Sequence, residues 1–219
     1  MLHLYALAEH PARLPAVAGI GGSSLAAVEV EGIDAIVSDL GAEPGGVDET
    51  ILVHARVVEE LAALNDAVLP ARLTDPFRAE AALLDAIGDR AQALKAALDR
   101  VRGCAELGVQ VVPRQNGVGP APGSGSEYMR SRLDAVRSAE GIADELDRAV
   151  GEVARDRTRR IAATPELVLT AAYLVPRSEV EPFRAAVESL QRARRDVAYV
   201  CVGPWPPYSF ALVDSGSPG

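Results

Sequence analysis

The segment at residues 203–210, with the sequence GPWPPYSF, constrains the fold of this chain more than any other. It follows directly on an apolar run, Val197–Val202, and it holds three of the 15 prolines and the only tryptophan. Proline has no backbone N–H and a fixed φ, so it interrupts both a strand ladder and a helix. We therefore predict that the chain leaves the sheet here as a stiff, extended arm.

Three aromatic side chains, Trp205, Tyr208 and Phe210, lie in this segment. They either fold back onto the core of their own domain or form a docking element. Aromatic side chains gain most free energy when buried, which favours a mainly structural Trp205 with Tyr208 nearer the surface. Aromatic residues also dominate interface hot spots, so all three are candidate partner-binding residues.

Apolar periodicity predicts strands and helices that alternate along the chain. The expected strands are 2–8, 25–30, 33–40, 68–73, 104–112, 167–175 and 197–202. The expected helices are 48–67, 77–101, 127–160 and 179–194. Asp48 is a candidate cap of the first helix, and Asp75-Pro76 is a candidate start of the second. The basic run 155–160 would close the third, where cations favour the helix dipole.

This order of elements predicts an α+β fold with two lobes of ferredoxin-like type. The two longest helices, 77–101 and 127–160, are expected to pack together as a helical hairpin. Residues 113–126 are rich in proline, glycine and serine and predict a flexible loop. The expected domains are therefore an N-terminal lobe at 1–112 and a C-terminal lobe at 127–219.

No pattern of catalytic or metal-binding residues stands out. His3, His10 and His54 have no metal-ligand spacing, and His54 lies at the edge of an apolar helical stripe, as a packing residue would. The glycines at 19–24 lack the lysine of a phosphate loop and precede a strand, which predicts a flexible loop instead. Cys104 and Cys201 are expected to be buried thiols. We predict no enzyme activity, no cofactor, no metal and no small-molecule substrate.

The net charge of −9 argues against nucleic acid as a partner, because nucleic acids require a basic face. No run approaches the roughly 20 apolar residues of a membrane span. The first eight residues have neither the cationic start nor the long apolar core of a signal peptide. The expected location is the cytoplasm.

The same GPWPPYSF segment, after its apolar strand, resembles the gas vesicle GvpL/GvpF family. The resemblance extends over nearly the whole chain. It includes Leu4–Ala6, Val68–Leu73, Glu106–Val112, Tyr128-Met129 and Leu167–Val175. Two places depart from the family pattern: residues 73–75 read Leu-Thr-Asp where Phe-Gly-Thr is expected, and Gln110 stands where lysine is usual.

This resemblance implies two modified ferredoxin-like lobes and an accessory or minor structural protein of gas vesicle formation. Such a protein would bind the hydrophobic major shell subunit, or other accessory gas vesicle proteins, in the cytoplasm or at the vesicle. Exposed sheet edges and apolar arms suit an aggregation-prone partner. The alternative is a ligand-sensing or enzymatic protein built on ferredoxin-like domains. That alternative predicts a polar pocket with perturbed acids.

Overall fold

The computed structural model describes residues 1–40, 46–73, 76–114, 124–164 and 167–211. Contacts divide the chain into two compact units. The first unit comprises Met1–Cys104 and the residues from Trp205 onward, and the second comprises Ala105–Pro204. This division differs from the predicted lobes. Residues 105–112 of the strand expected over 104–112, which was assigned to the N-terminal lobe, belong to the second unit. Of the predicted loop, residues 115–123 lie outside the described part.

The first unit contains a four-stranded antiparallel sheet. Its strands are β1 (Leu2–Glu9), β2 (Leu25–Val30), β3 (Ile33–Asp39) and β4 (Val68–Pro70), in the order β2-β3-β1-β4. The predicted hairpin is confirmed: Val30 pairs with Ile33 across a two-residue turn of Glu31 and Gly32. Both turn residues have a positive φ, 54° and 77°, as a type I′ turn requires.

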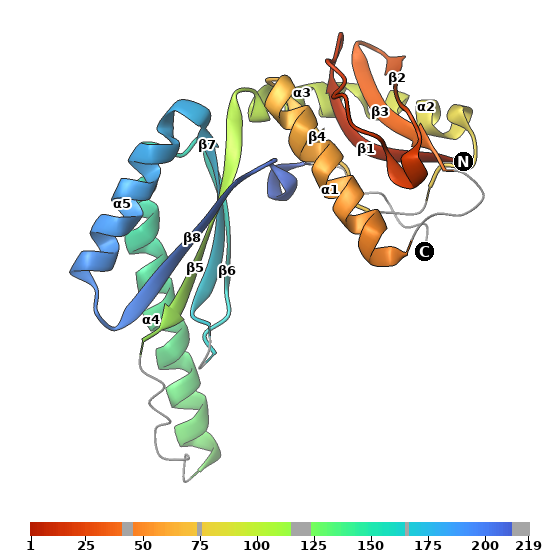
Figure 1. Ribbon diagram of the computed structural model, residues 1–219. Coiled ribbons are helices and arrows are strands. Elements are labelled where there is room, and N and C mark those ends of the chain that lie inside the picture. Colours follow the sequence, from red (N-terminus) through yellow and green to blue (C-terminus); the bar gives the residue numbers. More distant parts are fainter. Residues whose placement is uncertain (41–45, 74–75, 115–123, 165–166, 212–219) are drawn as a thin grey trace. The chain divides into compact units, whose positions relative to one another are not determined.

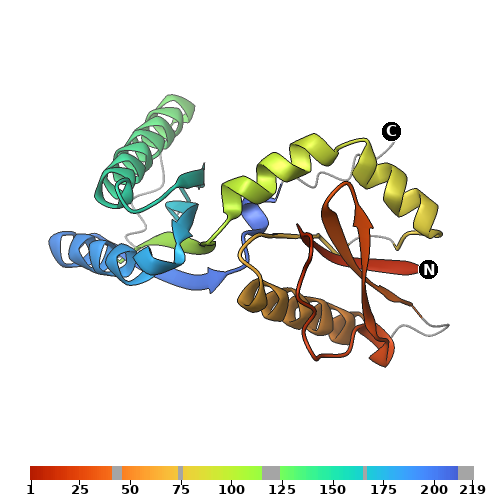
Figure 2. The ribbon, with the colours of Figure 1, turned by 90° about the horizontal axis from the view of Figure 1, so that it is seen from above.

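Helices cover both faces of this sheet (Figure 2). Helix α1 (Val47–Leu64) lies on one face, and α2 (Glu80–Gly88) and α3 (Ala91–Val101) lie on the other. Because both faces are covered, six successive residues of β3, from Ile33 to Ser38, are buried. Strands covered on both faces show continuous rather than alternating burial.

Two predicted helix starts are wrong. Helix α1 follows Gly46, and no side chain caps it, so Asp48 lies inside the first turn. The helix expected over 77–101 is two helices that are separated at Asp89 and Arg90. Phe77 instead forms a bridge to Leu2 of β1, through two backbone hydrogen bonds of 2.8 Å. That bridge holds this part of the chain extended before α2 begins.

The second unit has the βαββαβ order of a ferredoxin-like fold. Its elements are β5 (Cys104–Pro113), α4 (Gly125–Val150), β6 (Asp156–Ile161), β7 (Leu169–Pro176), α5 (Val180–Ala193) and β8 (Val197–Trp205). The antiparallel strands lie in the order β6-β7-β5-β8, the same arrangement as in the first sheet. Both helices lie on one face of this sheet (Figure 1). The predicted α+β class is confirmed. The predicted hairpin of the helices over 77–101 and 127–160 is not, because the helix that packs beside α4 is α5.

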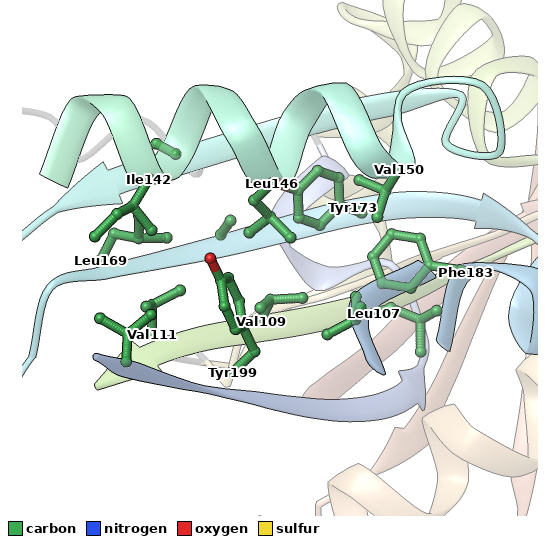
Figure 3. Close-up of a cluster of buried hydrophobic side chains, with 14 of the residues drawn as sticks. Leu107, Val109, Val111, Ile142, Leu146, Val150, Leu169, Tyr173, Phe183 and Tyr199 are labelled. Atoms are coloured by element: carbon green, nitrogen blue, oxygen red, sulfur yellow. The ribbon is translucent and has the colours of Figure 1, made fainter. Parts of the chain in front are cut away.

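A continuous apolar core joins the two helices to the sheet (Figure 3). Leu146 of α4 and Phe183 of α5 are completely buried in it, and the Phe183 ring lies 5.2 Å from that of Tyr173. The other labelled members are Leu107, Val109, Val111, Ile142, Val150, Leu169 and Tyr199. The C-terminal half of α4 is thus fixed by packing on the sheet.

All of the basic run except Arg155 belongs to strand β6, not to the end of a helix. The predicted helix over 127–160 is therefore ten residues too long at its C-terminus. Asp147 of α4 explains the basic residues. Its Oδ2 accepts from Arg159 at 2.8 Å and lies 3.3 Å from Arg157 Nε. The Tyr173 hydroxyl donates to the other carboxylate oxygen at 2.7 Å. One buried carboxylate therefore ties α4 to two neighbouring strands. The burial of the Tyr173 hydroxyl, and then its hydrogen bond to Asp147, raise the pKa of Tyr173.

We predict that this carboxylate stabilises the second unit. Asp147→Ala leaves the buried Tyr173 hydroxyl unsatisfied and should lower the free energy of unfolding by about 2–3 kcal/mol. Tyr173→Phe should cost about 1–2 kcal/mol, because Asp147 retains both arginines. Denaturant unfolding of the two single variants and the double variant measures the coupling. Additive losses would show that the Asp147–Tyr173 hydrogen bond does not contribute.

Candidate partner-binding surface

The aromatic segment, residues 203–210, is anchored to the first unit by its C-terminal end. A short 3-10 helix, η3 (Tyr208–Phe210), packs against β4. Phe210 is 3% exposed, and the Arg100 guanidinium lies 5.6 Å from the centre of its ring. Pro206 and Pro207 are also buried. These contacts fix the segment on the surface of the first unit.

Tyr208 packs at the edge of the core beneath α1. It is half-buried, and this burial, with a smaller contribution from the charge of Glu59, raises the pKa of Tyr208 to about 12. The ring therefore belongs partly to the core of its own unit. The prediction that Tyr208 is the more exposed of the two candidate aromatic residues is wrong.

Trp205 is 46% exposed, although its two following prolines are buried. Pro204, before it, is exposed as well. The prediction that Trp205 mainly caps its own domain is therefore wrong, because the buried positions are taken by Pro206, Pro207 and Phe210. Sequence reasoning could not assign these positions, since all of them are apolar and only the three-dimensional packing separates them.

The chain also remains in the sheet for longer than predicted. Strand β8 continues through Pro204 to Trp205 instead of ending at Val202. Proline is tolerated on an edge strand, where its missing N–H faces away from the ladder, and β8 is such an edge. One backbone group at this end of β8 is hydrogen-bonded to a side chain: the Gly203 carbonyl accepts from Arg184 at 2.7 Å.

A second cluster, in the first unit, brings two histidines together in the core. His3 Nε2 lies 2.8 Å from His54 Nδ1, and His54 Nε2 lies 3.0 Å from the Ala71 carbonyl oxygen. A carbonyl oxygen only accepts, so His54 carries its proton on Nε2 and accepts from His3 at Nδ1. Tyr5 stacks on His54 at 5.5 Å between ring centres. The predicted packing role of His54 stands, but its partner is 51 residues away and left no local sequence signal.

The hydroxyl of Tyr5 extends this cluster to the glycine-rich stretch at 19–24. It accepts from the Ile20 N–H at 2.7 Å and bonds to Ser38 Oγ at 2.9 Å. This stretch forms a short 3-10 turn, η1 (Ile20–Gly22), with Ile20 buried. It is thus a packed turn with hydrogen bonds to the core, and the predicted flexible loop is wrong there.

The histidine pair should make folding stability depend on pH. Burial, and then the neighbouring His54, lower the pKa of His3 from 6.5 to about 4, and burial also lowers the pKa of His54. Between pH 4 and pH 6.5 the His3 side chain binds a proton in the unfolded chain but not in the folded protein. The stabilisation is therefore complete above pH 6.5 and is lost as the pH falls towards 4. The loss due to His3 should be about 3 kcal/mol.

His3→Asn tests this expectation against the unsubstituted protein. Thermal unfolding is followed from pH 7 to pH 4 for both proteins. The drop in stability should be smaller in His3→Asn. An identical pH profile in His3→Asn and the unsubstituted protein would contradict the assigned role.

A shallow polar hollow of about 280 Å³ lies elsewhere on the first unit and includes Glu9, Arg13, Asp66 and Arg102. Its principal polar contact is the ion pair of Glu9 with Arg102, which also bonds to Asp99 at 2.7 Å. The hydrogen bond from Arg102 lowers the pKa of Glu9. A carboxyl group that titrates below its ordinary range does not serve as a general acid near neutral pH. Glu9 in this hollow is therefore one half of a surface ion pair with Arg102 and not a proton donor.

The described residues contain neither a membrane-spanning helix nor a metal-binding cluster. None of the described helices is long and apolar enough to cross a membrane. Among those same residues, no three His, Cys, Asp or Glu side chains gather in a way that could hold a metal ion. Exposed apolar side chains, Trp205 among them, are candidates for contact with a partner.

Comparison with known proteins gives a consistent result. The model of the family described as gas vesicle synthesis protein GvpL/GvpF matches residues 1–212. Gas vesicle protein F2 of Halobacterium salinarum is 24% identical over 92% of this chain and 87% of its own length. Gas vesicle protein L of a Streptomyces species is 30% identical, with 80% of each chain covered.

Solved structures show the same fold. The crystal structure of the gas vesicle protein GvpF from Anabaena superposes with a TM-score of 0.77 at 18% identity. The match covers 97% of this chain and 98% of the other. The fold described above is therefore present in an experimentally determined structure.

Proposed function

Because the chain belongs to the gas vesicle GvpL/GvpF family, we propose that it is an assembly factor that binds the hydrophobic shell subunit of the vesicle. The observation that carries this proposal is the exposure of Trp205 on an anchored segment. The protein would act in the cytoplasm or at the growing vesicle, alone or with other accessory gas vesicle proteins. Its role is binding, without a chemical step.

Two physical features of the segment support binding at Trp205. An indole combines a large apolar surface with one N–H donor, which makes tryptophan a frequent interface hot spot. The flanking prolines restrict the backbone, and Pro206 and Pro207 are already buried. The backbone that carries Trp205 is thus fixed before a partner arrives, so binding has only the side chain left to order.

The partner that suits this surface is apolar. An exposed tryptophan next to an exposed proline gains free energy when it is removed from water, and a very hydrophobic subunit offers the matching surface. The net charge of −9 would meanwhile keep the protein itself soluble while it holds an aggregation-prone chain. Binding of this kind protects the subunit until it joins the wall.

Substitution of Trp205 tests the proposal. Trp205→Ala should lower the free energy of unfolding by about 1–2 kcal/mol, less than truncation of a fully buried ring, because about half of the side chain is exposed. The same variant should lose most of the co-purification with the shell subunit, and Trp205→Phe should restore part of it. Affinity pull-down and thermal unfolding are measured on the same preparations.

Tyr128→Ala tests the competing exposed apolar side chains of α4, because Tyr128 is 55% exposed and Met129 and Leu133 near it are exposed as well. The proposed site predicts that this variant keeps the binding that Trp205→Ala loses. Phe210→Ala, in contrast, removes a buried ring and should cost about 3–5 kcal/mol of stability. Full shell-subunit binding by a folded Trp205→Ala protein would contradict the proposed site.

A further inference from the structure

We propose that the outer edge of β2 is a second docking site and that it pairs, antiparallel, with the same strand of a second copy of this chain. The free edges of the two sheets differ in how they are blocked, and this difference is independent of the binding of the shell subunit. An exposed edge strand is a template for another strand unless the protein blocks it.

Three of the four sheet edges carry a recognisable block. At β8, the Gln191 side chain of α5 accepts from the Tyr199 N–H at 2.8 Å, and Arg184 donates to the Gly203 carbonyl. Strand β6 presents three arginines in six residues. Strand β4 is three residues long and ends in Pro70. Side-chain caps, charge, shortness and proline are all known ways to prevent edge pairing.

Strand β2 has none of these features. It is six residues long, reads LAAVEV, and lies at the other end of the first sheet. Its only charged residue, Glu29, is turned back to its own hairpin, where Oε1 accepts from the Gly32 N–H at 2.7 Å. In the part of the chain that the structure describes, β2 hydrogen-bonds to β3 and no other strand pairs with it. The edge is thus open and largely apolar.

The hairpin register shows which backbone groups are available. Val30 and Ile33 close the two-residue turn and form a hydrogen-bonded pair, so alternate residues of β2 bond to β3. The N–H and C=O groups of Leu25, Ala27 and Glu29 therefore point away from the sheet. Ala27 and Glu29 are exposed, and Ala27, at the centre, has the small side chain that permits close approach of another backbone.

A second copy of β2 fits this edge. About a two-fold axis at Ala27, each alanine faces its equivalent, and Leu25 faces Glu29 of the other copy. All outward groups then meet, giving about six main-chain hydrogen bonds with no like charges directly opposite. Such an interface is isologous and closes at the dimer. It is small, so the association should be weak, and salt should strengthen it by screening two chains of net charge −9.

Proline at position 27 tests the inference with the full-length protein. Ala27→Pro removes an outward N–H that the first sheet does not use, so the fold should survive while pairing is lost. Ala27→Val keeps the N–H and is the matched control. The mass is measured by analytical ultracentrifugation over about a hundredfold range of concentration. The unsubstituted protein and Ala27→Val should shift towards dimer at high concentration, and Ala27→Pro should stay monomeric.

Ala27→Lys provides a second disrupting variant if the proline variant does not fold, because an edge lysine blocks pairing and leaves the backbone intact. Circular dichroism establishes that each variant is folded. A monomeric mass for the unsubstituted protein at every concentration and salt level would overturn the proposal. A dimer that persists in a folded Ala27→Pro or Ala27→Lys protein would overturn it as well.

Discussion

The burial of Phe210 is the contact on which the aromatic segment depends. Its ring lies beneath Arg100, and the short helix that carries it packs on β4. With Pro206 and Pro207 also buried, the backbone on both sides of Tyr208 is fixed to the first unit. Trp205 then has no buried position left to occupy. Its exposure follows from the packing of its neighbours, and this exposure supports the proposed binding site.

The sheets of the two units have the same order of strands, but they differ in how their faces and edges are covered. The first sheet is covered on both faces, whereas α4 and α5 share one face of the second. Both edges of the second sheet are blocked against pairing: Gln191 caps β8, and β6 carries three arginines. The first sheet has a short edge at β4 and an open one at β2. These differences locate the surfaces at which another chain can add to the structure.

Much of the fold could be predicted because local patterns determine it. The turn at Glu31-Gly32 and the apolar run of β5 each have a local signal. The strand β6 was missed because DRTRRI has no apolar alternation, and its arginines are explained only by Asp147 of α4. The split between α2 and α3 was missed because apolar residues recur at helical spacing on both sides of it.

The candidate site could be predicted only in part. The unusual composition of the aromatic segment singled out Trp205, Tyr208 and Phe210, but their exposure is decided by long-range packing. Similarly, His3 and His54 are 51 residues apart, and no spacing rule joins them. Single-sequence reasoning identifies an unusual segment more readily than it ranks the residues inside it, since burial is a property of the whole unit.

In the proposed complex, Trp205 itself enters the interface with the shell subunit. Because it is the only tryptophan, its fluorescence reports on this one position. The measurement is the emission spectrum of the protein during titration with shell subunit peptide that lacks tryptophan. We expect emission typical of a solvent-exposed indole in the free protein, and a shift to shorter wavelength that saturates with binding. Binding detected by co-sedimentation with no change in the tryptophan emission would contradict it.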